Sequence, residues 1–191
     1  MARIIVFSDF TCPFSFVTEA ALWRGARESG WEIDYRAFQL FPHPLPLPAA
    51  PPAAGEEALL RLAKDVGVRL DRPGPPARTA KAHEAAHHAR ERGLERELRS
   101  AIFAAYWSEG RDIGRIDVLV ELGRRVGLDV TELKVTLDID QHTEALLSGE
   151  AAAREVGVTA VPTLIVRTGY QPQLIVGTQS YAQLRQAVGS G

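Results

Sequence analysis

The chain has 191 residues, of which 46% are hydrophobic and 24% are charged, with a formal net charge of −2. This length and composition are sufficient for one buried core, or for one domain that carries a large insertion. The small negative charge argues against nucleic acid or an anionic membrane as a partner, and no apolar run approaches the roughly 18 residues of a membrane span. A single cysteine excludes a disulfide scaffold. Because the chain opens on strand-like residues rather than on a secretion signal, we expect a cytoplasmic, reduced protein.

The N-terminal residues predict a buried strand followed directly by a helix. Residues 4–7 are apolar and mostly β-branched, which is typical of a strand covered on both faces of a parallel sheet. Pro13 has a preset φ and lacks the N–H that would be left unbonded at a helix start, so we expect the helix to begin there with Cys12 at or beside its N-cap. The helix should continue to about Arg27 and end at Gly30.

A second strand and a stiff connection follow this helix. Residues 31–37 alternate between apolar and charged side chains, which predicts a strand and therefore a right-handed βαβ unit. Six prolines between 42 and 52 predict an extended, polyproline-like linker over residues 43–55. A ligand for an SH3-type domain is the alternative, and the absence of a flanking arginine argues against it.

Residues 56–156 are expected to be helical throughout. Apolar residues recur at helical spacing in three stripes, and four glycines mark helix ends. Thr131 followed by Glu132 is typical of a capped helix start. We expect four or more helices joined by short connections, and we treat residues 56–156 as a helical insertion. The stripes are 59–66, 94–106 and 118–126, and the glycines are Gly67, Gly93, Gly127 and Gly157.

Strand patterns return after Gly157. Residues 163–167 and 173–176 are predicted strands, and the intervening residues 168–172 favour a hairpin turn. A last helix is expected over about residues 181–188. The order is therefore strand, helix, strand, helical insertion, two strands and helix.

Cys12 is the residue with the clearest chemical potential. At a helix start, free N–H groups and the positive end of the helix dipole favour a thiolate, which predicts a pKa lowered from about 8.5 into the range of about 3.5–7.5. The competing interpretation is that a lone cysteine is a small buried hydrophobe.

The segment around Cys12 resembles the active-site segment of the DsbA family. Residues 9–16 (D-F-T-C-P-F-S-F) are similar to the family pattern Asp-x-x-Cys-Pro-Trp-Cys-Tyr, most closely to that of the cytoplasmic FrnE-like branch. Val161-Pro162 resembles the family's X–Pro pair, whose bond is cis and faces the cysteine. Five other segments resemble FrnE-like proteins in the same order, namely 38–40, 82–83, 106–113, 126–129 and 176–179.

The resemblance implies an α/β, thioredoxin-like fold with a mixed sheet. Residues 1–42 and 157–191 would form the thioredoxin-like domain, as βαβ and then ββα, interrupted by the helical insertion as in DsbA. It also implies thiol–disulfide oxidoreductase or isomerase activity, with Cys12 as nucleophile and Pro162 beside it.

The sequence departs from the family at Ser15, where relatives carry a resolving cysteine. A hydroxyl cannot form a disulfide, so no internal disulfide is possible. We therefore expect a monothiol enzyme whose mixed disulfide at Cys12 is released by an outside thiol, such as glutathione or the substrate's own second cysteine. Its partners would be protein or small-molecule thiols and disulfides, and glutathione is a possible co-substrate without any tightly bound cofactor.

The resemblance also implies residues that contact the substrate. These are Phe14, Val161, His83 and Gln179, of which Val161 would bond an extended substrate as though adding a strand. For Asp9, capping of the turn through its carboxylate is favoured over a role in moving the thiol proton.

Residues 83–87 also match H-E-x-x-H, the helix signature of zinc proteases. The continuation typical of metzincins is absent, because Arg90 occupies the place of a glycine. We therefore expect no metal, with His87 and His88 on a solvated helix face.

Two other functions remain open. The resemblance extends to kappa-class glutathione transferases and 2-hydroxychromene-2-carboxylate isomerases, which belong to the same fold. In those enzymes a serine occupies the position of Cys12, and an aspartate after a glycine near the last helix helps to hold glutathione. Gly177-Thr178-Gln179 is the similar place here and has glutamine, which favours the redox function. A binding protein with a vestigial site is the third possibility if Cys12 is buried and unreactive.

Overall fold

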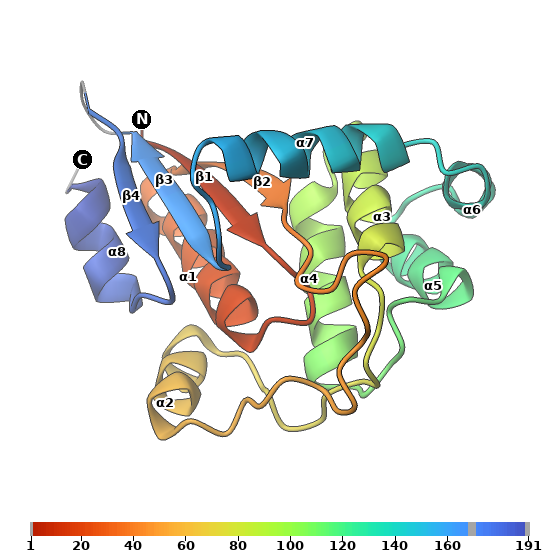
Figure 1. Ribbon diagram of the computed structural model, residues 1–191. Helices are drawn as coiled ribbons and strands as arrows, with labels where there is room; N and C mark the ends of the chain where they lie inside the picture. The colour runs from red at the N-terminus through yellow and green to blue at the C-terminus, as the bar shows by residue number, and fades with distance from the viewer. Residues whose placement is uncertain (1, 168–170, 190–191) are drawn as a thin grey trace.

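The computed structural model describes residues 2–167 and 171–189. Figure 1 shows a mixed sheet with helices on both faces and a group of helices beside it. The elements are β1 (Arg3–Ser8), α1 (Pro13–Ser29), β2 (Glu32–Ala37), α2 (Glu57–Val66), α3 (Ala80–Arg90), α4 (Glu95–Trp107), α5 (Ile116–Val126), α6 (Val130–Asp138), α7 (Thr143–Glu155), β3 (Thr163–Arg167), β4 (Gln173–Val176) and α8 (Tyr181–Val188).

The sheet has the strand order β2-β1-β3-β4. β1 pairs in parallel with β2, whereas β3 is antiparallel to both β1 and β4. The predicted mixed sheet is therefore confirmed. The predicted turn at 168–172 falls mainly on residues 168–170, which lie outside the described residues.

The two faces of β1 are buried against different elements. Ile4 and Val6 are fully buried in the large core that α1 also enters, whereas Phe7 packs in a smaller cluster with Phe38 and Ala153 of α7. Figure 1 shows α7 crossing one face of the sheet, with α1 and α8 behind the other. Because the strand is covered on both sides, its run of apolar residues has no polar alternation.

The first helix has the predicted ends. Cys12 is its N-cap, Pro13 is its first residue, and Gly30 ends it with a φ of 65° that favours glycine. Gly25 lies against the Trp31 ring, where a Cβ atom would be only 2.1 Å from a ring carbon. The close approach of α1 to the start of β2 therefore depends on a residue without a side chain.

The helices α3, α4, α5 and α6 lie together beside the sheet, and α2 lies apart from them in Figure 1. The predicted start at Thr131 is wrong: α6 begins at Val130, and the Asp129 carboxylate accepts the N-terminal bond from the Glu132 N–H at 2.8 Å. Thr131 lies inside the first turn, where its hydroxyl cannot serve as this cap. Within the described residues, no helix combines the length and apolarity needed to cross a membrane.

Candidate active site

Cys12 lies where β1 gives way to α1. Its backbone N–H donates to the Asp9 carbonyl at 3.1 Å and closes the turn, and its φ and ψ of −95° and 115° are those of an N-cap residue. The Cys12 side chain makes no capping bond, and its Sγ lies 3.6 Å from the Val161 carbonyl oxygen. The Val161-Pro162 bond is cis, as predicted. The two segments that carry the family resemblance, 149 positions apart, therefore meet at the sulfur.

The segment facing Cys12 is held by short bonds on either side of Pro162. The Thr163 hydroxyl donates to the Ala160 carbonyl at 2.7 Å, and the Pro162 carbonyl accepts from the Gly177 N–H at 2.8 Å. Val161 itself is half-buried and precedes β3. Its carbonyl is thus directed at the thiol from a fixed turn.

Ser15 lies in the first turn of α1 and is fully buried. Its Oγ accepts a long bond from the Asp9 N–H at 3.4 Å, and its hydrogen bonding to Cys12 favours the thiolate. Phe14 is half-buried, and its carbonyl accepts from the Thr178 hydroxyl at 3.1 Å. Gln179 follows that threonine and is also half-buried.

The pKa of the Cys12 thiol is raised, so the predicted lowering is wrong. Burial is the main cause, because the residue is only 4% exposed and the charged form is poorly solvated there. Hydrogen bonds from Ser15 and Phe14 act in the opposite direction but are weaker, and the Asp9 carboxylate raises the pKa further. The thiol is therefore protonated at neutral pH and is placed to donate to the Val161 carbonyl.

Asp9 fastens the turn that precedes the cysteine. Its Oδ1 accepts from the N–H and the hydroxyl of Thr11 at 2.7 and 2.6 Å. Its Oδ2 accepts from the Leu40 N–H at 3.0 Å and from the Thr79 hydroxyl at 2.8 Å. The favoured capping role agrees with these bonds, which also tie the turn to the end of β2 and the start of α3.

His83 lies behind this turn. It is 4% exposed, its ring centroid is 4.7 Å from that of Phe10, and its Nε2 is 3.8 Å from Asp9 Oδ2. Burial alone would raise the pKa of Asp9, but His83 and Thr11 together bring that pKa below its ordinary value. The burial of His83 argues against the expected substrate contact. Its position next to Asp9 instead favours the ionised form of that carboxylate.

A family model described as the DSBA-like thioredoxin domain matches residues 3–189. The chain belongs to this family. It is also 33% identical over 175 residues to the uncharacterized protein YwbO of Bacillus subtilis, a match that covers 86% of each chain.

Solved structures of DsbA-like and related proteins share the fold. A probable DsbA oxidoreductase from Streptomyces coelicolor is 23% identical, with a TM-score of 0.82 over 98% of this chain and 88% of the other. A 2-hydroxychromene-2-carboxylate isomerase is 18% identical, with a TM-score of 0.75 over 97% of this chain and 92% of the other. The cytosolic disulfide reductase DsbM from Pseudomonas aeruginosa, solved with GSH, is 18% identical, with a TM-score of 0.70 over 91% of this chain and 89% of the other.

A buried charged network, which sequence reasoning missed, lies beneath the end of β1. The Arg99 guanidinium donates to both Glu19 oxygens at 2.8 and 2.5 Å and to the Ser8 hydroxyl at 2.8 Å. All three residues are at most 2% exposed. The one available signal was Glu19 on the apolar side of the first helix, since a buried carboxylate needs a partner. The network joins α1 and α4 to Ser8, the last residue of β1 before the turn that leads to Cys12.

The two histidines of the H-E-x-x-H pattern have different neighbours: His83 Nε2 lies 3.8 Å from Asp9 Oδ2, whereas His87 lies beside Glu91 and His142. The next histidine, His88, is fully buried, with its Nδ1 3.1 Å from the Thr136 hydroxyl. The prediction of a solvated face is therefore wrong for His88, because α6 covers it. His87 is half-buried and lies beside Glu91 and His142.

Proposed function

We propose that the protein is a monothiol thiol–disulfide oxidoreductase or isomerase with Cys12 as its nucleophile. The observation that carries this proposal is the position of Cys12 Sγ at the start of α1, 3.6 Å from the carbonyl that precedes Pro162. Membership of the DSBA-like family supports a reaction of this class. Cys12 is the only thiol in the chain, so the reaction must pass through a mixed disulfide with the substrate.

The proposed cycle has two exchanges. The Cys12 thiolate attacks one sulfur of a substrate disulfide, a bond forms between those sulfurs, and the second substrate sulfur leaves as a thiolate and takes a proton. An external thiolate then attacks the substrate sulfur of the mixed disulfide and releases Cys12. Glutathione in this role leaves the substrate glutathionylated, whereas the substrate's own second cysteine leaves it with a rearranged disulfide.

The proton on Cys12 must be removed before the first exchange. Burial and the Asp9 carboxylate raise the pKa of the thiol, and the Val161 carbonyl is placed to accept its proton in a hydrogen bond. An extended substrate that donates a backbone N–H to this carbonyl would take that bond from the thiol. Binding would then favour ionisation at the moment when the disulfide sulfur arrives.

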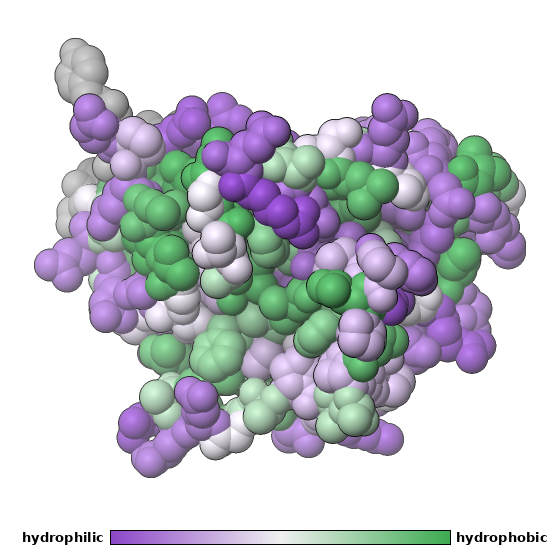
Figure 2. Space-filling model, viewed as in Figure 1, coloured by the Kyte–Doolittle hydropathy of each residue, from purple (hydrophilic) through white to green (hydrophobic). Residues whose placement is uncertain are grey.

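The surface around the site suits an apolar substrate segment. Leu174 and Val176 on the edge strand β4 are 54% and 57% exposed. Figure 2 shows apolar side chains gathered over β3 and β4 and over the centre of the same face. Exposed apolar surface of this kind is typical of interaction sites. We assign Phe14 and Val161 to contacts with this substrate segment. Gln179 follows Thr178, whose hydroxyl donates to the Phe14 carbonyl, and we assign it to the edge of the same substrate-binding surface.

Glutathione is the proposed external thiol, which places the reaction in a reducing compartment such as the cytoplasm. The structural similarity to a disulfide reductase that was solved with GSH supports this choice. We propose that the helical segment 56–156 supports the site from within the protein. It supplies Thr79, which bonds Asp9, and Arg99, which bonds Ser8 at the end of β1.

The direct test is turnover of a peptide–glutathione mixed disulfide in the presence of glutathione. With this substrate the Cys12 thiolate attacks the glutathione sulfur, the peptide thiolate leaves and takes a proton, and a second glutathione then frees Cys12 as oxidised glutathione forms. The unmodified protein should therefore accelerate the release of the peptide thiol, and Cys12→Ser should abolish this acceleration. Ser15→Cys places a second thiol within one helical turn of Cys12 and should add reduction of intramolecular protein disulfides. Retained activity in a correctly folded Cys12→Ser variant would exclude the proposed chemistry.

A glutathione-dependent isomerase or transferase is the second candidate. The observation in its favour is the structural similarity to 2-hydroxychromene-2-carboxylate isomerase. Turnover of 2-hydroxychromene-2-carboxylate by the unmodified protein with glutathione, together with redox silence of Ser15→Cys, would replace the redox function with this one.

A further inference from the structure

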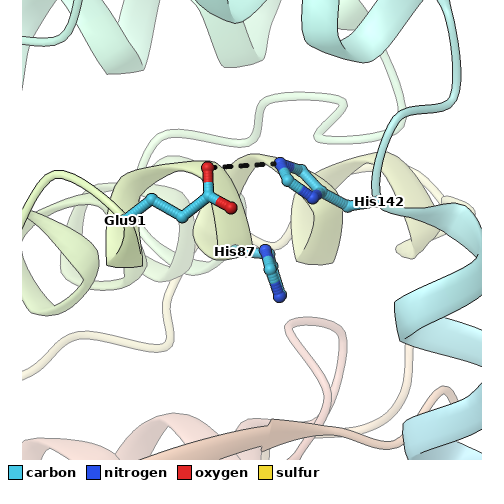
Figure 3. A group of neighbouring side chains, drawn as sticks. All are labelled: His87, Glu91 and His142. Atoms are coloured by element: carbon cyan, nitrogen blue, oxygen red, sulfur yellow. Dashed lines mark ion pairs between the residues drawn. The ribbon is translucent and has the colours of Figure 1, made fainter.

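Three potential ligand side chains converge between α3 and α7, outside the Cys12 site. They are His87 on α3, Glu91 at the C-cap of α3, and His142 at the N-cap of α7. One ligand atom from each lies within 4.8 Å of the other two. Figure 3 shows the side chains meeting between the two helices, with the Glu91 carboxylate directed at the His142 ring.

The local structure explains why they meet. His87 and Glu91 are four residues apart, so they project from the same side of α3. The backbone N–H of His142 donates to the buried Glu84 carboxylate at 3.3 Å, which fixes the start of α7 against α3. The imidazoles of His87 and His142 consequently have ring centroids only 4.3 Å apart.

The nitrogen atoms at this point lack hydrogen-bond partners. His142 Nε2 and His87 Nδ1 are both buried without one, and the His142 side chain is 7% exposed. His142 Nε2 approaches Glu91 Oε2 only to 3.8 Å, which is too long for a hydrogen bond. Buried polar groups are normally satisfied, so an arrangement of two unsatisfied imidazoles and a carboxylate points to a ligand between them.

The surroundings suit a small cation with its own waters. A cavity of about 170 Å³ lies beside the histidines and extends along α3 toward His83. Three arginines line the same cavity, and each is paired with a carboxylate: Arg90 with Glu95 at 2.8 Å, Arg36 with Asp34 at 2.7 Å and Arg99 with Glu19 at 2.5 Å.

We propose that His87, Glu91 and His142 bind a divalent transition metal of the zinc class. Two imidazole nitrogens and one carboxylate oxygen are a common ligand set for Zn²⁺, and water would complete the coordination. These residues are not the H-E-x-x-H set, because only His87 belongs to both. Cys12 does not line the adjoining cavity, so the metal site is separate from the thiol.

The proposed metal would join α3 to α7. Since α7 also packs on β2 and on the Phe7 cluster, a bound ion would fasten the helical group to the sheet. Ligand binding that is specific to the folded state raises its stability. We therefore expect Zn²⁺ at about 100 times its dissociation constant to raise the Tm by about 5–10 °C relative to the protein in EDTA.

The test is titration of the full chain, freed of metal with EDTA, with Zn²⁺ against a chromophoric chelator. One equivalent should bind, and Co²⁺ should give an absorption spectrum without thiolate-to-metal charge transfer. His142→Gln is informative because the His142 side chain makes no capping bond that the variant would lose. His87→Gln and His142→Gln should weaken Zn²⁺ binding by at least about tenfold.

Matched variants keep the test decisive. His43→Gln changes an exposed histidine elsewhere, and Cys12→Ser removes the thiol, so both should bind Zn²⁺ as the unmodified chain does. Glu91→Gln changes a side chain that is 47% exposed and should fold even where a histidine variant does not, and it should also weaken binding. Failure of the unmodified chain to bind Zn²⁺ below about 1 mM, or unchanged affinity in Glu91→Gln, would overturn the proposal. Neither result would affect the Cys12 chemistry.

Discussion

At Cys12, the first turn of α1 and the burial of the sulfur act on ionisation in opposite directions. The N-cap position and the bonds from Ser15 favour the thiolate, as at other helix starts. Burial and the nearby Asp9 carboxylate favour the thiol and are the stronger influence. In the free protein, the Cys12 thiol is therefore expected to be protonated at neutral pH.

This balance predicts slow alkylation of the free protein at neutral pH. Because the pKa of Cys12 is raised, the rate of iodoacetamide reaction should titrate with a midpoint above about 8.5, the ordinary thiol value. At pH 7 the rate should be below about 3% of its plateau, the thiolate fraction of a thiol with that pKa. A midpoint below 8 would show that the helix start dominates after all.

The same shift has a defined sign for stability. Because folding raises the pKa of Cys12, protonation of the thiol contributes to the free energy of unfolding. This contribution is fully present below the pKa of the unfolded protein and is lost as the pH rises through the pKa of the folded protein.

Ser15→Ala removes a bond that favours the thiolate, so its alkylation midpoint should move higher still. This variant is the control for the first measurement.

The residues that meet at the sulfur were predictable from the sequence, whereas their electrostatics were not. Pro13 after Cys12 predicts a helix start, and the resemblance of Val161-Pro162 to the family pair implies a cis bond; the structure contains both. The sulfur is buried in the folded chain, where a carbonyl oxygen from Val161, 149 positions away, lies 3.6 Å from it. Local sequence reports the helix dipole but not this covering, so it gave the wrong direction for the pKa.

Two helical glycines illustrate how packing decides the effect of one methyl group. Gly25→Ala in α1 would place its Cβ 2.1 Å from the Trp31 ring, so it should lower the free energy of unfolding by at least about 1–3 kcal/mol. Gly149→Ala in α7 meets no atom within 4 Å and should raise that free energy by about 0.5–1 kcal/mol. Urea unfolding of both variants checks this, and equal effects would contradict the described packing of α1.

The buried pair between α1 and α4 is expected to be critical for stability. Glu19→Gln leaves the Arg99 guanidinium buried without its counter-charge and should cost about 3–5 kcal/mol, measured by urea unfolding. Arg61→Ala removes a pair whose side chains are 69% and 83% exposed, and it should change stability by less than about 1 kcal/mol. A loss below 1 kcal/mol for Glu19→Gln would show that water reaches the pair.

Element boundaries were predicted best where one residue dictates the backbone. Pro13 and Gly30 fix the ends of α1 by their own geometry. The start of α6 was misplaced because Asp129 and Thr131 are both acceptable caps, and only the bond to Glu132 selects Asp129. The burial of His88 was missed for a different reason: it depends on α6 packing against α3, which periodicity along one helix does not report.

At the scale of the whole molecule, the helical group is connected to the sheet rather than appended to it. One large core contains residues of β1, α1 and α4, and α7 contacts both β2 and α3. The Asp9 turn is bonded to Thr79 at the start of α3, and the network below it reaches Arg99 of α4. The position of Cys12 is therefore set by both parts of the chain.

The measurement that tests the central claim most directly is reaction with oxidised glutathione, followed by intact mass and peptide mapping. The single thiol should accept one glutathione, located on Cys12, and reduced glutathione should release it. Cys12→Ser should take up none, and Ser15→Cys should end as an internal disulfide without glutathione. A native protein that stays unmodified at a pH above the measured midpoint of its alkylation, where Cys12 is ionised, would contradict the assignment of Cys12 as the nucleophile.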